Sequence, residues 1–92
     1  MTDHQKHKYS ADWFAHSRAH YEQFLTHLTG KPCHILEIGC FEGRGTCWLL
    51  ENIATNRAAR ITCIDIKERK SFWRNVEASG AKTKVALKLG YS

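Results

Sequence analysis

Apolar side chains recur along the chain first at helical spacing and then in short continuous runs. Between positions 11 and 28 aromatic and aliphatic residues repeat every three to four residues, and Gly30 followed by Pro32 marks the end of that segment. We therefore expect a helix over residues 11–28, either continuous or broken near Ser17. Beyond it, the same reasoning predicts strands over 33–38, 60–64 and 84–89, and helices from about 43–46 to 55 and over 70–79.

The predicted elements alternate along the chain in the order α-β-α-β-α-β. Short connections between consecutive strands of this kind are typical of parallel pairing with right-handed crossovers through the helices. The expected fold class is therefore α/β, one half of a doubly wound, Rossmann-like fold whose strands stand in the order 3-2-1. The first two strands show little alternation of polar and apolar residues, which predicts helices on both faces of the sheet.

The length of the chain, 92 residues, allows one domain at most. We expect residues 1–11 to be a polar, disordered tail and residues 12–92 to form a partial domain of this fold. The N-terminal residues lack the apolar core of a signal peptide, and no apolar run is long enough to cross a bilayer. A cytoplasmic location without a membrane partner is the default expectation.

The chain carries 14 Lys and Arg against 9 Asp and Glu, a net charge of +5, and most of the excess lies from residue 67 onward. A basic surface can attract nucleic acid, but it is equally typical of the solvated face of a surface helix. Because no aromatic or glycine-rich nucleic-acid motif accompanies the charge, a basic nucleic-acid-binding module is only an alternative to the main interpretation below.

Cysteine and histidine spacings do not predict a metal centre. The four cysteines, at positions 33, 40, 47 and 63, form no Cys-x-x-Cys pair, and we expect most of them to be small buried side chains. His16 and His20 stand four apart on the first predicted helix, but no Cys or carboxylate joins them at a fitting spacing. We expect both on the helix surface and nominate no metal ligand.

The turn after the first predicted strand is the strongest candidate for a binding site. Gly39, Gly43 and Gly45 lie between a strand and a helix start. At such a point small residues let a ligand approach the backbone, and the first helical N–H groups favour an anionic group. The same glycine spacing fits the turn of short-chain dehydrogenases, which bind NAD(P).

Carboxylates around the turn favour a ligand with cationic groups over a dinucleotide. Glu37 and Glu42 flank the turn and would repel a pyrophosphate, but they would attract an ammonium or sulfonium group. Asp65, at the end of the second predicted strand, is placed to accept hydrogen bonds from ribose hydroxyls in either case. We predict S-adenosylmethionine (SAM) as the cofactor, with an NAD(P)-binding dehydrogenase fragment as the alternative.

The segment 37–46, EIGCFEGRGT, resembles motif I of class I SAM-dependent methyltransferases. More narrowly, it is similar to the branch that includes catechol O-methyltransferase-like enzymes and a related bacterial family, because Phe41 stands where the common pattern has its middle glycine. Gly45 departs from the serine that is usual in that branch. Asp65 matches the acidic residue after the second strand, and the resemblance covers about residues 12–92.

The resemblance implies which residues would hold the cofactor. It assigns the residues of the turn to the methionine end of SAM: Glu37, Gly39, Cys40, Phe41, Gly43 and Thr46, the last two near the cofactor's carboxylate. It assigns residues after the second and third strands to the adenosine end: Asp65 to the ribose, Ile66 to the adenine ring, and Ser92 or Tyr91 to the adenine edge.

The resemblance also implies the reaction, methyl transfer from the sulfonium to an oxygen or nitrogen of a small-molecule acceptor. In the family the residues that orient the acceptor follow the third strand. We therefore nominate no catalytic residue and expect an N-terminal fragment that lacks strands 4–7 and is inactive alone. The first strand is central in this fold, and its free edge would expose unpaired amides beside Ile35, Leu36 and Ile38. We expect self-association through that edge.

Overall fold

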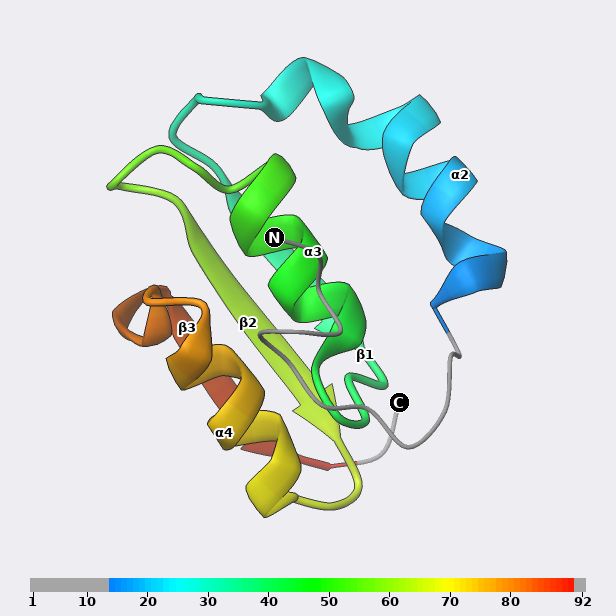
Figure 1. The fold of residues 1–92 in the computed structure, drawn as a ribbon, viewed down its shortest axis with the longest axis vertical. Helices are drawn as coiled ribbons and strands as arrows, with labels where there is room; N and C mark the ends of the chain where they lie inside the picture. The colour runs from blue at the N-terminus through cyan, green and yellow to red at the C-terminus, as the bar shows by residue number, and fades with distance from the viewer. Residues whose placement is uncertain (1–13, 91–92) are drawn as a thin grey trace.

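The computed structural model describes residues 14–90, which form a three-stranded sheet with helices packed against it (Figure 1). Strands β1 (His34–Ile38), β2 (Arg60–Asp65) and β3 (Val85–Leu89) are parallel and stand in the order β1-β2-β3. In this register Glu37 stands opposite Cys63, which in turn stands opposite Leu87. The parallel α/β architecture and the strand order predicted from the sequence are confirmed.

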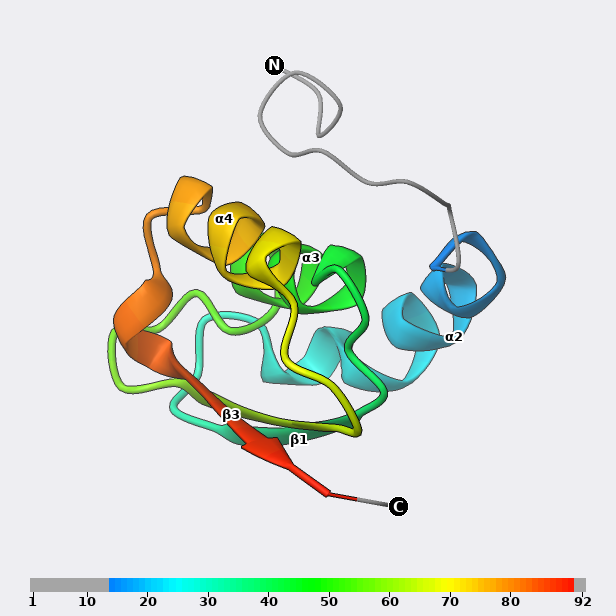
Figure 2. The same cartoon turned by 90° about the horizontal axis from the view of Figure 1, so that it is seen from below.

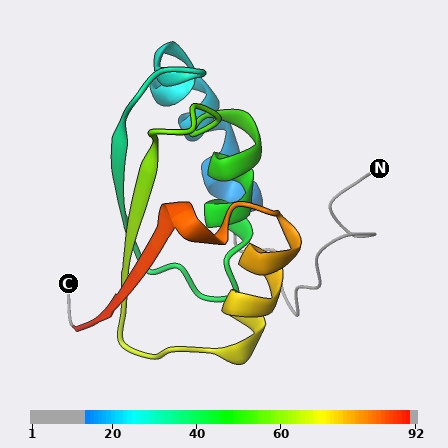
Figure 3. The ribbon, with the colours of Figure 1, turned by 90° about the vertical axis from the view of Figure 1, so that its left-hand side faces the viewer.

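Three helices belong to the described part of the chain. α2 (Ala15–Leu25) leads through a 3₁₀ turn, η1 (Thr26–Leu28), to β1; α3 (Arg44–Asn52) connects β1 to β2; and α4 (Lys70–Ala78) with η2 (Lys82–Lys84) connects β2 to β3. α3 and α4 lie on one face of the sheet, and α2 lies beside α3 (Figures 2 and 3). Right-handed crossovers that advance in one direction across a sheet place their helices on the same face, as they do here. Among residues 14–90 no helix is long and apolar enough to cross a bilayer.

The core lies between the sheet and these helices. α3 buries every residue from Gly45 to Leu50, because one side of it faces the sheet and the others face α2 and α4. α4 buries Phe72, Asn75 and Val76, whose spacing of three and four residues defines one helix face. The opposite side of α4 faces solvent.

An aromatic cluster fixes α2 against α3. The ring centroid of Tyr21 lies 4.9 Å from that of Phe14 and 6.0 Å from that of Trp48, and Phe14 and Trp48 lie 5.6 Å apart. Phe14 and Trp48 are buried, which confirms their expected place in the core. Edge-to-face packing of this kind contributes roughly 0.5–1.5 kcal/mol per pair beyond the area it buries.

The second face of the sheet carries no helix among residues 14–90, which corrects the prediction that helices cover both faces. Leu36 and Ile38 of β1 are 59% and 56% exposed on that face, while Glu37 between them is buried on the other. β1 pairs with β2 along one edge and with no described strand along its other edge. The apolar residues of β1 therefore form an exposed surface in this part of the chain.

Two details of the helices also differ from the sequence prediction. α2 is continuous through Ser17, whose N–H donates to the Phe14 carbonyl at 2.9 Å, so a break there is wrong. Residues 11–13 of the predicted helix lie outside the described part. α3 ends at Asn52 rather than near residue 55, and Ile53 (φ −119°) is its C-cap.

Candidate functional site

The carboxyl ends of the three strands meet at one edge of the sheet, where the turn from β1 to α3 begins. The Gly39 N–H donates to the Ile64 carbonyl at 2.8 Å, which extends the pairing of β1 and β2 by one residue. The chain then turns through left-handed conformations at Gly39 (φ 79°), Phe41 (φ 46°) and Gly43 (φ 86°). Glycine adopts such angles readily, whereas Phe41 needs support from its surroundings.

Asp65, the last residue of β2, provides that support. Its Oδ2 accepts the N–H of Phe41 at 2.9 Å, and its Oδ1 accepts the N–H groups of Ile66 at 2.7 Å and Lys67 at 3.3 Å. Arg69 lies 3.7 Å from the same carboxylate and stands over the Phe41 ring, 4.5 Å from its centroid. The carboxylate therefore ties the β1–α3 turn to the loop between β2 and α4.

These donors keep Asp65 ionised. Burial raises the pKa of its carboxyl, but the N–H groups of Phe41, Lys67 and Ile66 together with the Arg69 guanidinium outweigh burial, and the pKa lies below its usual range. The Cys40 thiol also donates to Oδ2 of this carboxylate, at 3.7 Å.

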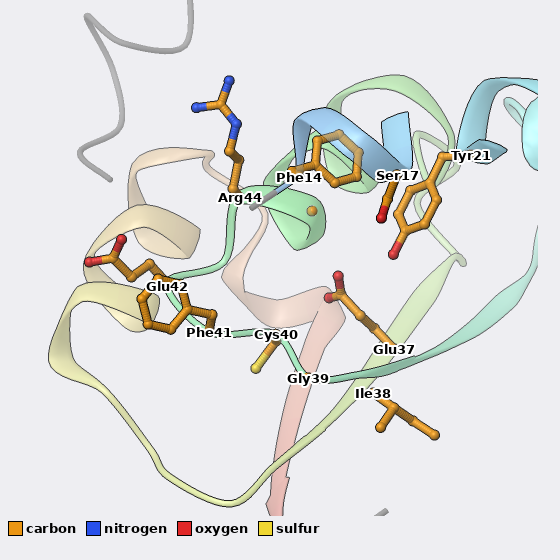
Figure 4. A pocket seen from close by; sticks show the side chains of 11 residues that line it. Phe14, Ser17, Tyr21, Glu37, Ile38, Gly39, Cys40, Phe41, Glu42 and Arg44 are labelled. Atoms are coloured by element: carbon orange, nitrogen blue, oxygen red, sulfur yellow. The ribbon is translucent and has the colours of Figure 1, made fainter. Parts of the chain in front are cut away.

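Glu37 has the opposite environment. Its side chain is only 7% exposed, and its carboxylate points from β1 toward α2 (Figure 4). The Thr46 hydroxyl donates to Oε1, and the Cys63 thiol donates to the same oxygen at 3.6 Å. Burial raises the pKa of Glu37 above its usual value, although these two hydrogen bonds act in the other direction. Such a carboxylate gains free energy from a cation placed beside it.

Neighbouring side chains approach the backbone closely at the start of α3. A Cβ on Gly45 would lie 2.6 Å from Oε2 of Glu37 and 3.3 Å from the ring of Phe14. A Cβ on Gly43 would lie 3.2 Å from the ring of Phe72. In this structure a side chain at position 45 would require the Glu37 carboxylate to shift.

Two cavities lie on either side of Gly39. The first has a volume of about 160 Å³ and lies between the turn and α2, with Glu37 at its base (Figure 4). The second, about 210 Å³, lies at the strand ends and is lined by Ile38, Gly39, Ile64, Asp65, Ile66 and Gly90. Pockets for drug-sized ligands measure roughly 300–1,000 Å³. Each cavity alone is smaller than this range, and the two share Ile38 and Gly39 in their linings.

A family model described as a methyltransferase domain matches residues 36–92, which is more than half of the chain. The chain belongs to this methyltransferase domain family. The predicted resemblance to class I SAM-dependent methyltransferases is thereby confirmed, and the family uses SAM as its methyl donor. Comparison with curated proteins and with solved structures gave no match.

The methyltransferase domain brings most of the predicted site residues to the two cavities. Those that line the first are Glu37, Gly39, Cys40 and Phe41, and those that line the second include Asp65 and Ile66. Two predicted residues have other contacts. Gly43 packs against the ring of Phe72. The Thr46 hydroxyl donates a hydrogen bond to Glu37. Ser92 and Tyr91 lie outside the described residues.

The sequence pattern did not reveal that the first helix forms a wall of the first cavity. Phe14, Ser17 and Tyr21 line the first cavity opposite Glu37 (Figure 4). Burial and the Glu37 carboxylate raise the pKa of Tyr21 to about 12, so its hydroxyl stays protonated at neutral pH. The spacing 14-17-21 was the available signal, but aromatic residues at this spacing usually mark only a core face.

The remaining candidate residues have structural positions in the methyltransferase domain. Cys40, Cys47 and Cys63 are buried free thiols and Cys33 is half-buried, which confirms the expectation that most are small buried side chains. His20 is exposed on α2, as expected, while the side chain of His16 is outside the described part. Within residues 14–90 no three potential metal-ligating side chains come together.

Proposed function

We propose that this methyltransferase domain binds SAM in an extended form past Gly39, with the methionine end in the first cavity and the adenosine end in the second. The observation that carries the proposal is the contrast between the two carboxylates beside Gly39. Buried Glu37 suits a cationic group, and ionised Asp65 suits the donor hydroxyls of a ribose. The apolar side chain of Ile66, which is 66% exposed at the second cavity, suits the face of an adenine ring.

The other predicted residues support this arrangement in different ways. Thr46 would act on the cofactor through Glu37, to which it donates a hydrogen bond. Cys40 and Phe41 would form the wall of the first cavity, and Gly43 would let the turn enter α3 at a left-handed angle. A position of Ser92 at the adenine edge stays a prediction.

When bound, SAM supplies a methyl group on a sulfonium, which an acceptor oxygen or nitrogen takes by direct displacement to leave a thioether. The contribution of this chain is to bind and orient the donor, since alignment of the two reacting centres supplies much of the rate in such reactions. We propose a small-molecule acceptor. The narrower similarity to catechol O-methyltransferase-like enzymes rests on Phe41, whose left-handed backbone places an aromatic residue where glycine is common.

Gly39→Ala, with Gly80→Ala as its matched control, tests this proposal. Both glycines have φ 79°, and a Cβ added to either has no neighbour within 4 Å. The two substitutions should therefore reduce the stability of the fold by similar amounts. Only the methyl group at position 39 would stand between the two cavities, in the path of an extended ligand.

Isothermal titration of the full chain with SAM provides the readout. We expect the wild-type chain and Gly80→Ala to bind SAM, and Gly39→Ala and Glu37→Ala to lose most of the binding. Equal SAM affinity in all four proteins would refute the proposed site. Binding of NADH or NADPH without any binding of SAM would instead favour the dehydrogenase interpretation.

A further inference from the structure

The first cavity has two walls that come from distant parts of the sequence. One is the β1–α3 turn with Glu37, and the other is the start of α2, which presents Phe14, Ser17 and Tyr21. These three positions, spaced by three and four residues, form one stripe of the helix. The aromatic contacts of Tyr21 with Phe14 and Trp48 hold this stripe in place.

Three oxygen-bearing groups converge in this cavity. The hydroxyls of Ser17 and Tyr21 and the carboxylate of Glu37 are directed toward the same space, whereas the side chain of Glu42 points away from it (Figure 4). Both hydrogen bonds that Glu37 accepts from Thr46 and Cys63 go to Oε1. Among residues 14–90 no hydrogen bond reaches Oε2, so this oxygen is available to a ligand.

The chemistry of these groups fits a primary ammonium. An ammonium group has three N–H donors and no acceptor, while a carboxylate oxygen and two hydroxyl oxygens supply three acceptors. A carboxylate ligand is disfavoured at the same point because it would face the Glu37 side chain across a buried space. The aromatic rings of Phe14 and Tyr21 add apolar walls that strengthen a charge-assisted hydrogen bond by excluding water.

We propose that Ser17 and Tyr21 of α2 complete, with Glu37, a binding site for the primary ammonium group at the amino-acid end of the methyl donor. This inference rests on the proposed function and adds a helix that lies outside the matched residues 36–92 to the cofactor site. It makes α2 a part of the binding machinery rather than only a cover for the core. The hydroxyls act as acceptors, and their orientation follows from the packing of α2 on Trp48.

The variants Tyr21→Phe and Ser17→Ala test the inference, and Glu22→Gln on the exposed side of α2 is the control. Tyr21→Phe keeps the ring and its packing and removes only the hydroxyl. The probes are SAM, decarboxylated SAM, which keeps the ammonium group, and 5′-methylthioadenosine, which lacks the amino-acid end. Thermal unfolding of each variant without ligand measures any effect on the fold itself.

We expect Tyr21→Phe to weaken binding of SAM and of decarboxylated SAM about tenfold, as for loss of one hydrogen bond to a charged group. Ser17→Ala should act in the same direction, binding of 5′-methylthioadenosine should change in neither variant, and Glu22→Gln should bind all three ligands like the wild type. An equal loss for all three ligands would indicate a structural role and overturn the inference. Unchanged SAM affinity in a variant that combines Tyr21→Phe with Ser17→Ala would also overturn the inference, while leaving the proposed function intact. Absence of SAM binding to the wild-type chain would refute the proposed function, and the inference with it.

Discussion

The substitution Gly43→Ala tests how tightly the β1–α3 turn is packed, and Gly80→Ala is its control. Both glycines have left-handed backbones, with φ 86° and φ 79°. A Cβ on Gly80 would meet nothing within 4 Å. A Cβ on Gly43 would lie 3.2 Å from Cδ1 of Phe72 and 3.6 Å from the Phe72 carbonyl oxygen. The two variants therefore share a conformational cost, and only one of them adds a steric cost.

The magnitudes follow from these two terms. A left-handed conformation costs an L-residue roughly 1–2 kcal/mol. The free energy of unfolding therefore falls by this amount in both variants. Overpacking a rigid core costs typically about 1–3 kcal/mol. The Phe72 side chain is fully buried, so its ring cannot move away freely from an added Cβ. We expect Gly80→Ala to lose about 1–2 kcal/mol and Gly43→Ala at least about 1 kcal/mol more. For a domain of this size 1 kcal/mol corresponds to roughly 4–8 °C in Tm.

Urea and thermal unfolding followed by far-UV circular dichroism would measure the difference. A double-mutant cycle with Phe72→Leu separates the two terms, because a smaller side chain removes the ring atoms nearest the added Cβ. In the Phe72→Leu background the cost of Gly43→Ala should fall to that of Gly80→Ala. Equal losses for the two glycine variants in the wild-type background would refute the reasoning, since α4 would then not restrain the turn.

Three further outcomes follow from the charges and the exposed strand. Because folding raises the pKa of Glu37, its carboxyl contributes fully to the free energy of unfolding only below its ordinary pKa. This contribution is lost as the pH rises through the pKa of the folded state. Glu37→Gln should thus be more stable than wild type at pH 7 in urea unfolding, and lower stability there would contradict the assigned burial effect. The lowered pKa of Asp65 has the opposite sign, so Asp65→Asn should destabilise the fold at pH 7 and lose this effect as pH falls through the folded-state pKa, in the same titration. Exposed Leu36 and Ile38 lie beside the edge of β1 that pairs with no strand among residues 14–90, and they predict concentration-dependent association in sedimentation velocity that Ile38→Lys reduces. A monomer at every concentration would argue against this prediction.

Much of the fold followed from local patterns in the sequence. The apolar runs located β1 and β2 to within one residue, and the glycine-rich turn between them marked the edge where the cavities lie. These features depend on neighbours close in sequence, which is why a single sequence contained them.

Features that depend on tertiary contacts were harder to predict. Nothing in the sequence tells which face of β1 the helices of residues 14–90 leave exposed, because apolar side chains stand on both faces of the strand. Tyr21 lies near Glu37 only because α2 packs on α3. The spacing of aromatic residues that predicts this packing is the same whether or not the helix also lines a cavity. Asp65 was predicted as a ligand for ribose, but the structure also shows it as the group that stabilises Phe41.

The two carboxylates of the site differ in whether their charge stabilises the fold without a ligand. Asp65 accepts main-chain hydrogen bonds and faces Arg69, so its charge stabilises the turn without any ligand. The charge of Glu37 does not stabilise the fold in this way, because among residues 14–90 Glu37 forms no ion pair with Lys or Arg. A glutamine could accept the same hydrogen bonds from Thr46 and Cys63 without an ionisable group. A carboxylate that destabilises the empty fold at neutral pH gains from a cation that enters from outside. The counterion that Glu37 lacks within the described chain is therefore best supplied by the ligand, and this is why Glu37 rather than Asp65 defines the cationic end of the site.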